Sequence, residues 1–360
     1  MQWRKFLGIS GSIVSILVSL VYTPSALAAT PTDTPVDLTI SPALVNLVAQ
    51  PGQTVTTDLR VKNSGVQTEK LHVDLLKFGA NGDTGQPQLM GRGPSDDYFN
   101  WASFSQNNFT AEPNVWMTIR MTVAVPAKAA GGYYYAAVFS RQNPATASHG
   151  ESAIQAGSAI LVLLDVEAPT VKHSAKIVSF TADRKFYEFL PANFSVKLRN
   201  DGDVHVAPTG NIFIKRGGSQ VDMLEFNAGN GNILPHTNRV FTEAWQNGFP
   251  AYSEQRRGNA VVTDAHGQPV RKLTWNFNSS LSKLRFGHYT ADLLAVYDNG
   301  QQDVPIEATV SFWVLPWRLL AVALVALLFG GAGIWATSRG VWKKVRRPKP
   351  EATHKPKTHA

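Results

Sequence analysis

The stretch TVTTDLRVKNSG, residues 54–65, alternates between apolar and polar side chains and then ends in Asn-Ser-Gly. A period of two over a run of this length predicts a half-buried β-strand. The buried face of this strand is expected to carry Val55, Thr57, Leu59 and Val61. The Asn-Ser-Gly end predicts a tight turn in which Gly65 takes a positive φ without steric cost.

The last five residues of this stretch, VKNSG, are matched by LRNDG at residues 198–202, 137 positions later (202 − 65). Each segment combines an apolar residue, a cation, Asn, a polar residue and Gly. We therefore expect a second strand that ends in the same kind of turn, with Gly202 in the role of Gly65. The match indicates two copies of one fold, and a chain of 360 residues is long enough for two ordinary domains.

A second pair of matching segments has the pattern Gly-x-Tyr-x-Ala, at residues 132–136 and 287–291. In Ig-like sandwiches a tyrosine near the start of the penultimate strand ties a corner through its hydroxyl, so Tyr134 and Tyr289 are candidates for tyrosine corners. Their separation is 155 (289 − 134) rather than 137. The second copy should therefore hold about 18 extra residues (155 − 137), which we expect within the loop-like segment 226–284.

Segments rich in β-branched and aromatic residues fill both halves of the chain, and no long amphipathic helix interrupts them. The first half contains LHVDLLKF, VWMTIRMTVAV, GYYYAAVF and SAILVLLDVEA, and the second contains NFSVKLRN, YTADLLAVYD and EATVSFWV. Gly, Pro, Asn and Ser separate them, as turns do. The predicted fold class is all-β, with two tandem Ig-like β-sandwich domains at residues 36–168 and 169–312.

The N-terminus has the pattern of an export signal. Arg4 and Lys5 precede an apolar run, and Ala26-Leu27-Ala28 supplies a small-x-small cleavage site. The sequence therefore predicts a signal peptide at residues 1–28 and a proline-containing spacer at 29–35. A retained N-terminal anchor stays open as an alternative, and in both cases the body of the chain is exported.

The C-terminal region contains LLAVALVALLFGGAGIWATS, residues 319–338, which has no charged residue and is long enough to cross a bilayer as a helix. We predict a single transmembrane α-helix at residues 315–337 and a basic cytoplasmic tail at 338–360. Membrane anchoring is expected from Trp313, Trp317, Trp335, Lys343, Lys344, Arg346 and Arg347. The cations follow the helix, so the expected topology is single-pass type I with the body outside the cytoplasm.

The net charge of +8 comes from the ends of the chain. The tail contributes +7 and the signal peptide +2, which leaves the exported body near −1 (8 − 7 − 2). Such a body has no basic surface for nucleic acid. The chain also lacks cysteine, which excludes disulfide scaffolds, cysteine zinc sites and thiol nucleophiles.

Three segments carry a resemblance to a known family: LVAQPGQTVTTDLRVKNSG (residues 47–65), WASFSQNNFTAEPNVWMTIRMTVAVPAKAAGGYYYAAVFSRQ (101–142) and the closing SFWVLPWRLL. The chain resembles the WxL-interacting proteins of bacterial cell surfaces. This resemblance implies an Ig-like domain associated with peptidoglycan, a second Ig-like domain for a host or partner protein, and one membrane helix with a basic tail. The second domain departs more from the family, at residues 200–218 and 233–241.

No catalytic motif is present in its required setting: neither GxSxG, HExxH, a P-loop, GxGxxG in a βαβ unit nor an SxxK set. The exported histidines are scattered without the spacing of metal ligands. Segments 81–87 and 200–205 gather side-chain oxygens, but hairpin turns explain both better than a calcium loop. The sequence therefore predicts a protein that is not an enzyme and that uses no cofactor or metal.

The aromatic stretch DDYFNWASF, residues 96–104, is the strongest ligand-contact candidate. Sugars dock on aromatic rings while polar neighbours bind their hydroxyls. The candidate contacts are Asp96, Asp97, Tyr98, Asn100 and Trp101. The alternative, in which Trp101 fills the sandwich core, stays open.

The predicted function is a membrane-anchored cell-surface binding protein whose tandem Ig-like domains bind peptidoglycan, another wall polymer or a surface protein. The alternative function is an accessory or chaperone-like subunit of a secretion, pilus or surface-assembly system that acts by edge-strand pairing. The edge strand for that alternative is expected near VWMTIRMTVAV, residues 115–125.

Overall fold

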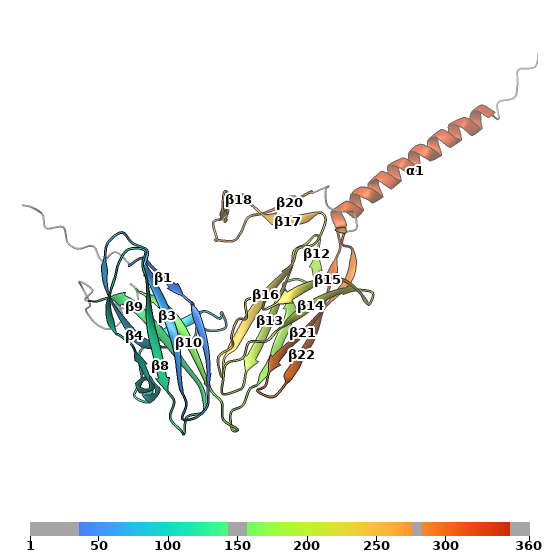
Figure 1. Cartoon of the computed structure of the whole chain (residues 1–360). Coiled ribbons are helices and arrows are strands. Elements are labelled where there is room, and N and C mark those ends of the chain that lie inside the picture. Colours follow the sequence, from blue (N-terminus) through green and yellow to red (C-terminus); the bar gives the residue numbers. More distant parts are fainter. Residues whose placement is uncertain (1–35, 143–156, 276–282, 346–360) are drawn as a thin grey trace, which may run out of the picture.

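The chain folds into two β-sandwiches followed by one helix, which confirms the predicted fold class (Figure 1). The computed structural model describes residues 36–142, 157–275 and 283–345. The predicted signal peptide, spacer and most of the tail lie outside these ranges. The two sandwiches meet at one end, and the helix leaves from the opposite end of the second sandwich (Figure 1).

The first sandwich packs a sheet of order β1-β3-β8-β6 against a sheet of order β2-β10-β9-β4-β5. The first sheet contains β1 (Leu38–Ser41), β3 (Thr54–Asn63), β8 (Trp116–Ala124) and β6 (Ala102–Phe104). The second contains β2 (Leu44–Ala49), β10 (Ser158–Val166), β9 (Gly131–Arg141), β4 (Glu69–Ala80) and β5 (Pro87–Met90). Beside β4 lies β7 (Asn108–Ala111), and a 3-10 helix η1 (Asp97–Trp101) precedes β6.

The second sandwich packs a sheet of order β11-β13-β16 against a sheet of order β12-β22-β21-β14-β15. The smaller sheet contains β11 (Ala175–Ala182), β13 (Ala192–Asn200) and β16 (Asn238–Trp245). The larger contains β12 (Phe186–Tyr187), β22 (Asp303–Val314), β21 (Gly287–Asp298), β14 (Thr209–Arg216) and β15 (Ser219–Phe226).

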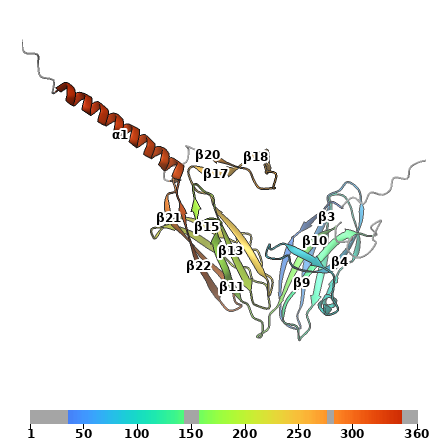
Figure 2. The same cartoon turned by 180° about the vertical axis from the view of Figure 1, so that it is seen from behind.

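A thin ribbon projects from the second sandwich near the start of the helix (Figure 2). It consists of two strand pairs, β17 (Ala251–Glu254) with β20 (Arg271–Thr274), and β18 (Arg256–Arg257) with β19 (Ala260–Val261). The ribbon falls inside residues 226–284, where the spacing of the two tyrosine motifs predicts extra residues.

The core of each sandwich follows the alternation of its strands. Leu59 and Val61 of β3 are fully buried, as the period of two predicts, and they pack with Ile119 and Met121 of β8. In the second core, Trp245 packs against Tyr289 and Phe312. Removing an aliphatic side chain such as that of Leu59 or Val61 from water stabilises the fold by about 1.5–3 kcal/mol.

Asn63 ends β3 with a fully buried side chain. Its Nδ2 donates to the carbonyl oxygens of Gln67 (2.6 Å) and Ala111 (3.0 Å). Its Oδ1 accepts a hydrogen bond from the amide of Gly65 (2.9 Å). The side chain therefore closes the turn and connects it to β7, which belongs to the other sheet of the sandwich.

Asn200 ends β13 and makes the same three hydrogen bonds as Asn63. Its Nδ2 donates to the carbonyl oxygens of Val204 (2.7 Å) and Ile233 (2.9 Å), and its Oδ1 accepts from the amide of Gly202 (2.7 Å). The repeated sequence thus encodes a repeated hydrogen-bond network, in which a buried amide replaces ladder bonds where the strand stops.

The turn glycines have a different role from the predicted one. Neither Gly65 nor Gly202 has a positive φ, so conformational freedom does not explain them. Close neighbouring atoms explain them instead, because a Cβ on Gly65 would lie 3.1 Å from Oδ1 of Asn63. A Cβ on Gly202 would clash with the carbonyl oxygen of Lys172 and lie 2.8 Å from the amide of Ser174. Both glycines admit close neighbours.

Tyr289 has the geometry of a tyrosine corner. Its hydroxyl accepts a hydrogen bond from the amide of Phe286, three residues upstream, at 3.1 Å. Its ring packs in a triangle with those of Trp245 and Phe312, whose centroids lie 5.2 and 5.8 Å away. The hydrogen bond fixes the start of β21 against the core.

Tyr134 does not take this role in the first sandwich. Its hydroxyl is buried and has no hydrogen-bond partner among the described residues, and its ring packs on the outer face of the sheet. The corner bond comes from Tyr133, whose hydroxyl donates to the carbonyl oxygen of Ala130 at 3.2 Å. Gly131, two residues before Tyr133, and the glycine two residues before Tyr289 both have positive φ, 93° and 117°. The motif is therefore offset by one residue from the predicted match.

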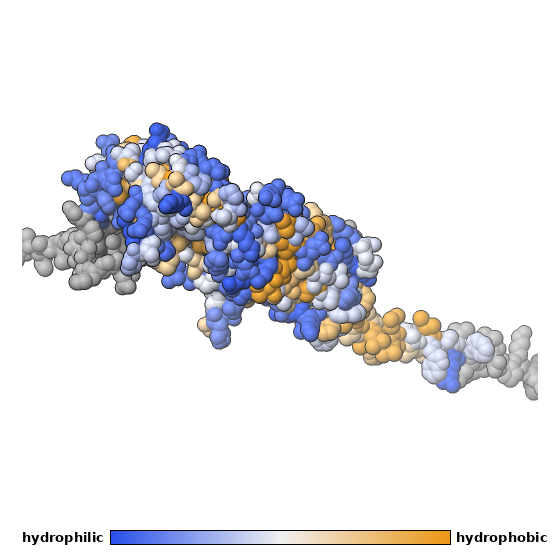
Figure 3. All heavy atoms as spheres, turned by 90° about the horizontal axis from the view of Figure 1, so that it is seen from below, coloured by the Kyte–Doolittle hydropathy of each residue, from blue (hydrophilic) through white to orange (hydrophobic). Residues whose placement is uncertain are grey.

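Helix α1 (Trp317–Val345) follows β22 after a junction of two residues. Its apolar part, Trp317–Arg339, contains an 18-residue stretch with a mean hydropathy of 2.3, and none of that stretch is buried. Figure 3 shows apolar side chains along the helix beyond the second sandwich. Its length and composition fit a membrane-spanning helix, which begins two residues later than predicted.

Candidate binding site at the junction of the sandwiches

The sheet that contains β9 and β10 is apolar on both faces. Its inner face joins the core of the first sandwich, while its outer face forms a separate apolar cluster. A strand buried on both faces reads as a continuous apolar run, as SAILVLLDV does in β10. The outer cluster contains Phe78, Ala136, Val138 and Leu163, with Leu76, Leu89, Tyr134, Ala159, Leu161 and Leu234 packed against it. Because Leu234 belongs to the second sandwich, this cluster joins the two sandwiches.

The backbones of the two sandwiches approach each other closely at the start of β9. The amide of Gly132 donates to the carbonyl oxygen of Asp203 at 2.8 Å. A Cβ on Gly131 would lie 3.3 Å from that same oxygen. Nearby, Nδ1 of His205 lies 2.9 Å from Oδ1 of Asp165, and both side chains are about 10% exposed. The junction is thus built from specific polar contacts as well as apolar packing.

The turn between β4 and β5 clasps the second sandwich (Figure 2). Its Asp83 forms an ion pair with Lys197 of β13, and the carbonyl oxygen of Asp83 accepts from the amide of Val240 at 2.8 Å. The hydrogen bond from Lys197 holds the pKa of Asp83 below its ordinary value. These contacts cover the outer edge of β16.

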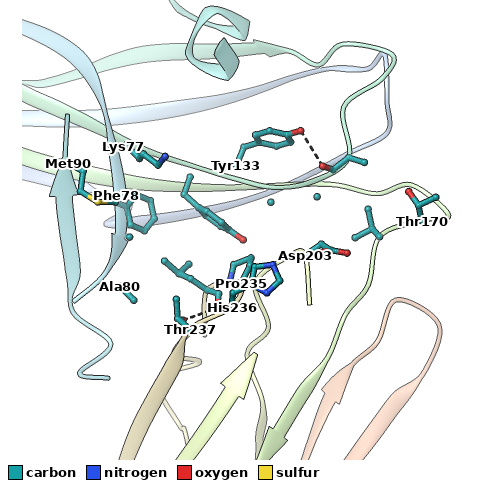
Figure 4. Close-up of a pocket in the computed structure, with 17 residues that line it drawn as sticks. Lys77, Phe78, Ala80, Met90, Tyr133, Thr170, Asp203, Pro235, His236 and Thr237 are labelled. Carbon is teal, nitrogen blue, oxygen red and sulfur yellow. Dashed lines mark hydrogen bonds between the residues drawn. The ribbon is translucent and has the colours of Figure 1, made fainter. Parts of the chain in front are cut away.

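A cavity of about 590 Å³ lies at this junction (Figure 4). Lys77, Met90 and Tyr133 line it from the first sandwich, and Asp203 and His236 line it from the second. The buried hydroxyl of Tyr134 is part of the same wall, and burial raises the pKa of Tyr134. The cavity therefore offers an apolar floor with a few polar groups, as binding sites do.

A second cavity of about 260 Å³ lies between the start of β2 and the loop 229–234. Leu44 and Leu161 form its wall on the first sandwich, and Arg239 forms part of the opposite wall. This cavity adjoins the open edge of the sheet, because Leu44, which lines the cavity, is also the first residue of β2.

Arg239 is a cation without a carboxylate partner in the described part of the chain. Its Nη1 donates to the carbonyl oxygen of Asn232 (2.8 Å), and its guanidinium lies 5.0 Å from the ring centroid of Phe241. Its Nε is buried and has no acceptor there, and burial lowers its pKa. A Cβ on Gly85 or Gly231 would press on the guanidinium. Arginine presents five donors in a fixed fork, so this site has capacity left for an anion.

Strand β2 is the open edge of its sheet. Among the residues that the structure describes, it pairs with β10 alone, in parallel, through Leu44 to Ala49. The carbonyl oxygens of Ala43 and Ala49 accept hydrogen bonds from the amides of Leu161 in β10 and of Glu167 just after it. Because successive residues of a strand point to opposite sides, the residues Leu44, Asn46 and Val48 direct their amide and carbonyl groups away from β10. The side chains of Leu44 and Val48 are 39% and 63% exposed.

The composition of β2 is unusual for an edge strand. Native proteins protect open edges with charges, prolines or bulges. The other long edge strands follow this rule: β11 has a register shift and Lys176, and β15 carries Asp222 and Glu225. In contrast, the sequence LVNLVA of β2 has no charge and no proline. It therefore lacks the residues that usually prevent an edge strand from pairing with another strand.

The edge strand expected from the sequence lies elsewhere. We predicted an edge near residues 115–125, but β8 pairs with β3 on one side and with β6 on the other. Only its first half lacks a second neighbour. The sequence reasoning missed β2, although its uncharged run between Pro42 and Pro51 was a usable signal.

The predicted ligand-contact residues lie on and beside η1. Asp97 and Asn100 are exposed, while Tyr98 and Trp101 are half-buried and pack against the first core. The ring of Trp101 lies 4.6 Å from that of Tyr133. The structure thus supports the open alternative that Trp101 belongs to the core, and ligand contact at this site stays a prediction.

The carboxylate of Asp96 is held by hydrogen bonds within the first sandwich. Its Oδ1 accepts from Nζ of Lys77 (2.7 Å), and its Oδ2 accepts from the amide of Gly93 (2.7 Å). These two bonds, the lysine bond first, hold the pKa of Asp96 below its ordinary value. Burial raises the pKa of Tyr98, whose hydroxyl points to the carbonyl oxygen of Tyr134.

The predicted membrane anchors lie at the ends of the apolar span. Trp313, Trp317 and Trp335 are 44%, 56% and 60% exposed. The guanidinium of Arg339 lies 4.5 Å from the ring centroid of Trp335. The side chains of Lys343 and Lys344, and all of Arg346 and Arg347, lie outside the described residues. Within the described ranges, no group of three or more acidic or histidine side chains is placed to hold a metal ion.

Comparisons with known proteins give weak similarities. No protein-family model and no curated protein matches the chain. The class 5 fimbriae chaperone CfaA is 13% identical with a TM-score of 0.33, over 78% of this chain and 100% of that chain. A chaperone-tip adhesin complex of CFA/I fimbriae biogenesis is 15% identical with a TM-score of 0.32, over 66% and 98%. The Pseudomonas aeruginosa CupB2 chaperone is 10% identical with a TM-score of 0.30, over 77% and 100%.

TM-scores of this size do not carry a function from those proteins to this chain. The functional argument therefore rests on the contacts and edges described above. The resemblance of the sequence to WxL-interacting proteins stays a prediction.

Proposed function

We propose that this chain is a membrane-anchored, non-enzymatic subunit of a surface-assembly system, which holds an extended segment of another surface protein along β2. The observation that supports this function is the open, uncharged edge of β2. Adding a strand to an exposed edge is a general mode of protein recognition. Main-chain hydrogen bonds supply affinity, and the exposed alternate side chains supply selectivity.

The bound segment would pair with the free backbone groups of Leu44, Asn46 and Val48. Its side chains on the outer face would cover Leu44 and Val48, which are now exposed. Burial of apolar surface contributes about 25 cal/mol per Å². A partner strand with alternating apolar residues fits this edge.

The cavity beside Arg239 extends the same site. Because Leu44 both begins β2 and lines this cavity, a segment on β2 reaches the cavity at one end. A carboxylate of the partner would pair with the unused donors of Arg239. The ion pair of Asp83 with Lys197 and the contact of Asp165 with His205 hold the two walls in place.

The proposed topology places this site outside the cytoplasm. α1 would cross the membrane once, and the basic tail that follows it would stay on the cytoplasmic side. The chain would then be a single-pass type I membrane protein. Its partners would be surface proteins, and nucleic acid is not among them.

Site-specific photo-crosslinking tests the proposal in the cell envelope. We would place a photoreactive amino acid at Val48 on β2 or, as a control, at Val66, which is 92% exposed in the same sandwich. The expected result is a discrete protein adduct from position 48 that position 66 does not give. Replacing Asn46 with proline should abolish the adduct, because proline removes an outward N–H. No adduct at position 48, or equal adducts at both positions, would contradict the function.

Wall-polymer binding is a second candidate function. It is favoured by Asp97 and Asn100, which stand exposed beside the half-buried rings of Tyr98 and Trp101. The full-length protein should then sediment with insoluble peptidoglycan. The double variant Asp97→Ala, Asn100→Ala should lose most of this retention without unfolding, since both side chains are exposed. Equal retention of both proteins would remove η1 as a sugar site.

A further inference from the structure

The second sandwich is joined to α1 by a short and braced connection. Only Leu315 and Pro316 separate β22 from α1. The amide of Leu315 donates to the carbonyl oxygen of Tyr187 at 2.7 Å, and Nε of Arg318 lies 3.5 Å from Oε1 of Glu188. Two residues span at most about 7 Å. If α1 crosses a membrane, as proposed above, the end of the sandwich that carries β12 lies at the membrane surface.

That end of the sandwich presents aromatic side chains to solvent. Phe186 is 66% exposed and is paired in register with Trp313, which is 44% exposed. Trp317, at the start of α1, is 56% exposed. Single exposed apolar residues are ordinary on protein surfaces, but these three are neighbours at the root of an apolar helix. Tryptophan and other aromatic residues with this placement are typical of a membrane interface.

Two cations stand directly before Phe186. Arg184 and Lys185 are exposed, and neither forms an ion pair within the described ranges of the chain. The neighbouring acids are used internally, because Asp183 accepts from the hydroxyl of Tyr187 and Glu188 pairs with the helix. The tip therefore combines two exposed cations, Lys185 and, beside the carboxylate of Asp183, Arg184, with exposed aromatic rings, and both suit an anionic lipid surface.

We infer that this tip, formed by Arg184, Lys185, Phe186 and Trp313, is seated in the headgroup layer of the leaflet from which α1 emerges. The partner is the phosphate of anionic phospholipids, which the two cations bind while the rings enter the interface. The inference rests on the membrane anchoring of the proposed function and not on strand pairing at β2.

Spin-label depth measurement tests the inference with the full-length protein in nanodiscs. The chain has no native cysteine, so single substitutions direct the label without background. Phe186→Cys places it on the tip, and Gln301→Cys places it in the exposed turn at the far end of β22. A strand of twelve residues is about 40 Å long, so the control label is remote from the membrane. Leu327→Cys marks the interior of the apolar span.

The expected result is a label at position 186 that oxygen reaches better than a water-soluble nickel reagent does, while the label at 301 shows the reverse. In nanodiscs with phosphatidylglycerol, the double variant Arg184→Gln, Lys185→Gln should raise nickel access at position 186 several-fold. In pure phosphatidylcholine the same variant should change little.

Two results would overturn the inference. The first is equal nickel access at positions 186 and 301 while the label at 327 is shielded, which would leave the membrane anchor intact and the tip in water. The second is water exposure at position 327, which would remove the anchor itself. Neither result depends on whether β2 binds a strand, so photo-crosslinking at Val48 still tests that part separately.

Discussion

Asp83 of the first sandwich forms an ion pair with Lys197 of the second, across a junction that joins segments 114 residues apart. The contact brings the turn between β4 and β5 onto β13. It also keeps the walls of the Arg239 cavity together, since Gly85 on the same turn lies against the guanidinium. Loss of the charge on Asp83 is therefore expected to change the geometry of the candidate site.

We expect the junction to loosen in acid. The pKa of Asp83 is lowered in the folded chain by Lys197, so its stabilising effect is present above its unfolded pKa, about 3.9, and is lost as the pH falls through the folded value. Distances between labels on the two sandwiches should increase below about pH 4. Asp83→Asn should show the same increase at neutral pH. Asp58→Asn, which breaks the pair with Arg120 inside one sandwich, should leave these distances unchanged.

Loss of the buried amide at the end of β13 should be costly. Asn200→Ala leaves the carbonyl oxygens of Val204 and Ile233 without their donor, which should lower the free energy of unfolding by about 1–3 kcal/mol. Asn107→Ala, at an exposed position, should change it by less than about 0.5 kcal/mol. Urea unfolding measures both. Equal, small losses would show that the repeated asparagine does not stabilise the turn.

Gly202 should tolerate no side chain. Gly202→Ala places a methyl group against the backbone of Lys172 and Ser174, and we expect a loss of about 1–3 kcal/mol in unfolding free energy. Gly229→Ala is the matched control, because its Cβ meets no atom within 4 Å. A thermal shift assay separates the two. A neutral Gly202→Ala variant would contradict the close approach.

Proline should distinguish the two sides of β2. Asn46→Pro removes an N–H that faces the open edge, so the free protein should keep its fold with a change below about 1 kcal/mol. Leu47→Pro removes an N–H that pairs with β10 and should cost about 3 kcal/mol or more. Leu47→Ala corrects for the lost side chain. Similar losses for both prolines would mean that β2 has no free edge.

Arg239 should contribute little to the stability of the free protein. Desolvation of a half-buried cation is unfavourable, and no carboxylate partner compensates for it here among the described residues. Arg239→Met should therefore change the free energy of unfolding by less than about 1 kcal/mol. Arg141→Met should cost more, since it strands Glu69, which accepts two bonds from Arg141. Denaturant unfolding of both variants checks this contrast. A large loss at Arg239 would assign it a packing role in place of an anion site.

The sequence predicted the two sandwiches because their signals are local. Strand alternation in residues 54–65 and the Asn-x-Gly repeat depend on neighbouring residues, so Leu59, Val61 and both asparagines lie where the pattern places them. The tyrosine corner was misplaced by one residue in the first sandwich. The motif selects Tyr134, the middle one of three consecutive tyrosines, and only the pleat decides that Tyr133 points inward and Tyr134 outward.

The candidate site was less predictable because it depends on distant segments. The open edge of β2 exists only because β10, more than a hundred residues later, pairs on its other side. In the sequence, Arg239 looks like an ordinary cation on a strand, and only the fold shows that the turn at Gly85 lies against its guanidinium. The glycines Gly65 and Gly202 were located correctly, but the reason for Gly202, crowding by the remote backbone of Lys172 and Ser174, has no local signal.

The two-residue connection between β22 and α1 also determines how the protein bears force. If β2 holds a partner and α1 crosses the membrane, as proposed, a pull on that partner would act on β22 from its last residue. β22 is paired with β21 over its whole length, from Asp303 to Val314, and the pull runs along that ladder. Because the hydrogen bonds lie across the strands, they are loaded together in shear rather than opened one by one. In the proposed function, the second sandwich would thus couple the bilayer mechanically to the segment held by the first sandwich.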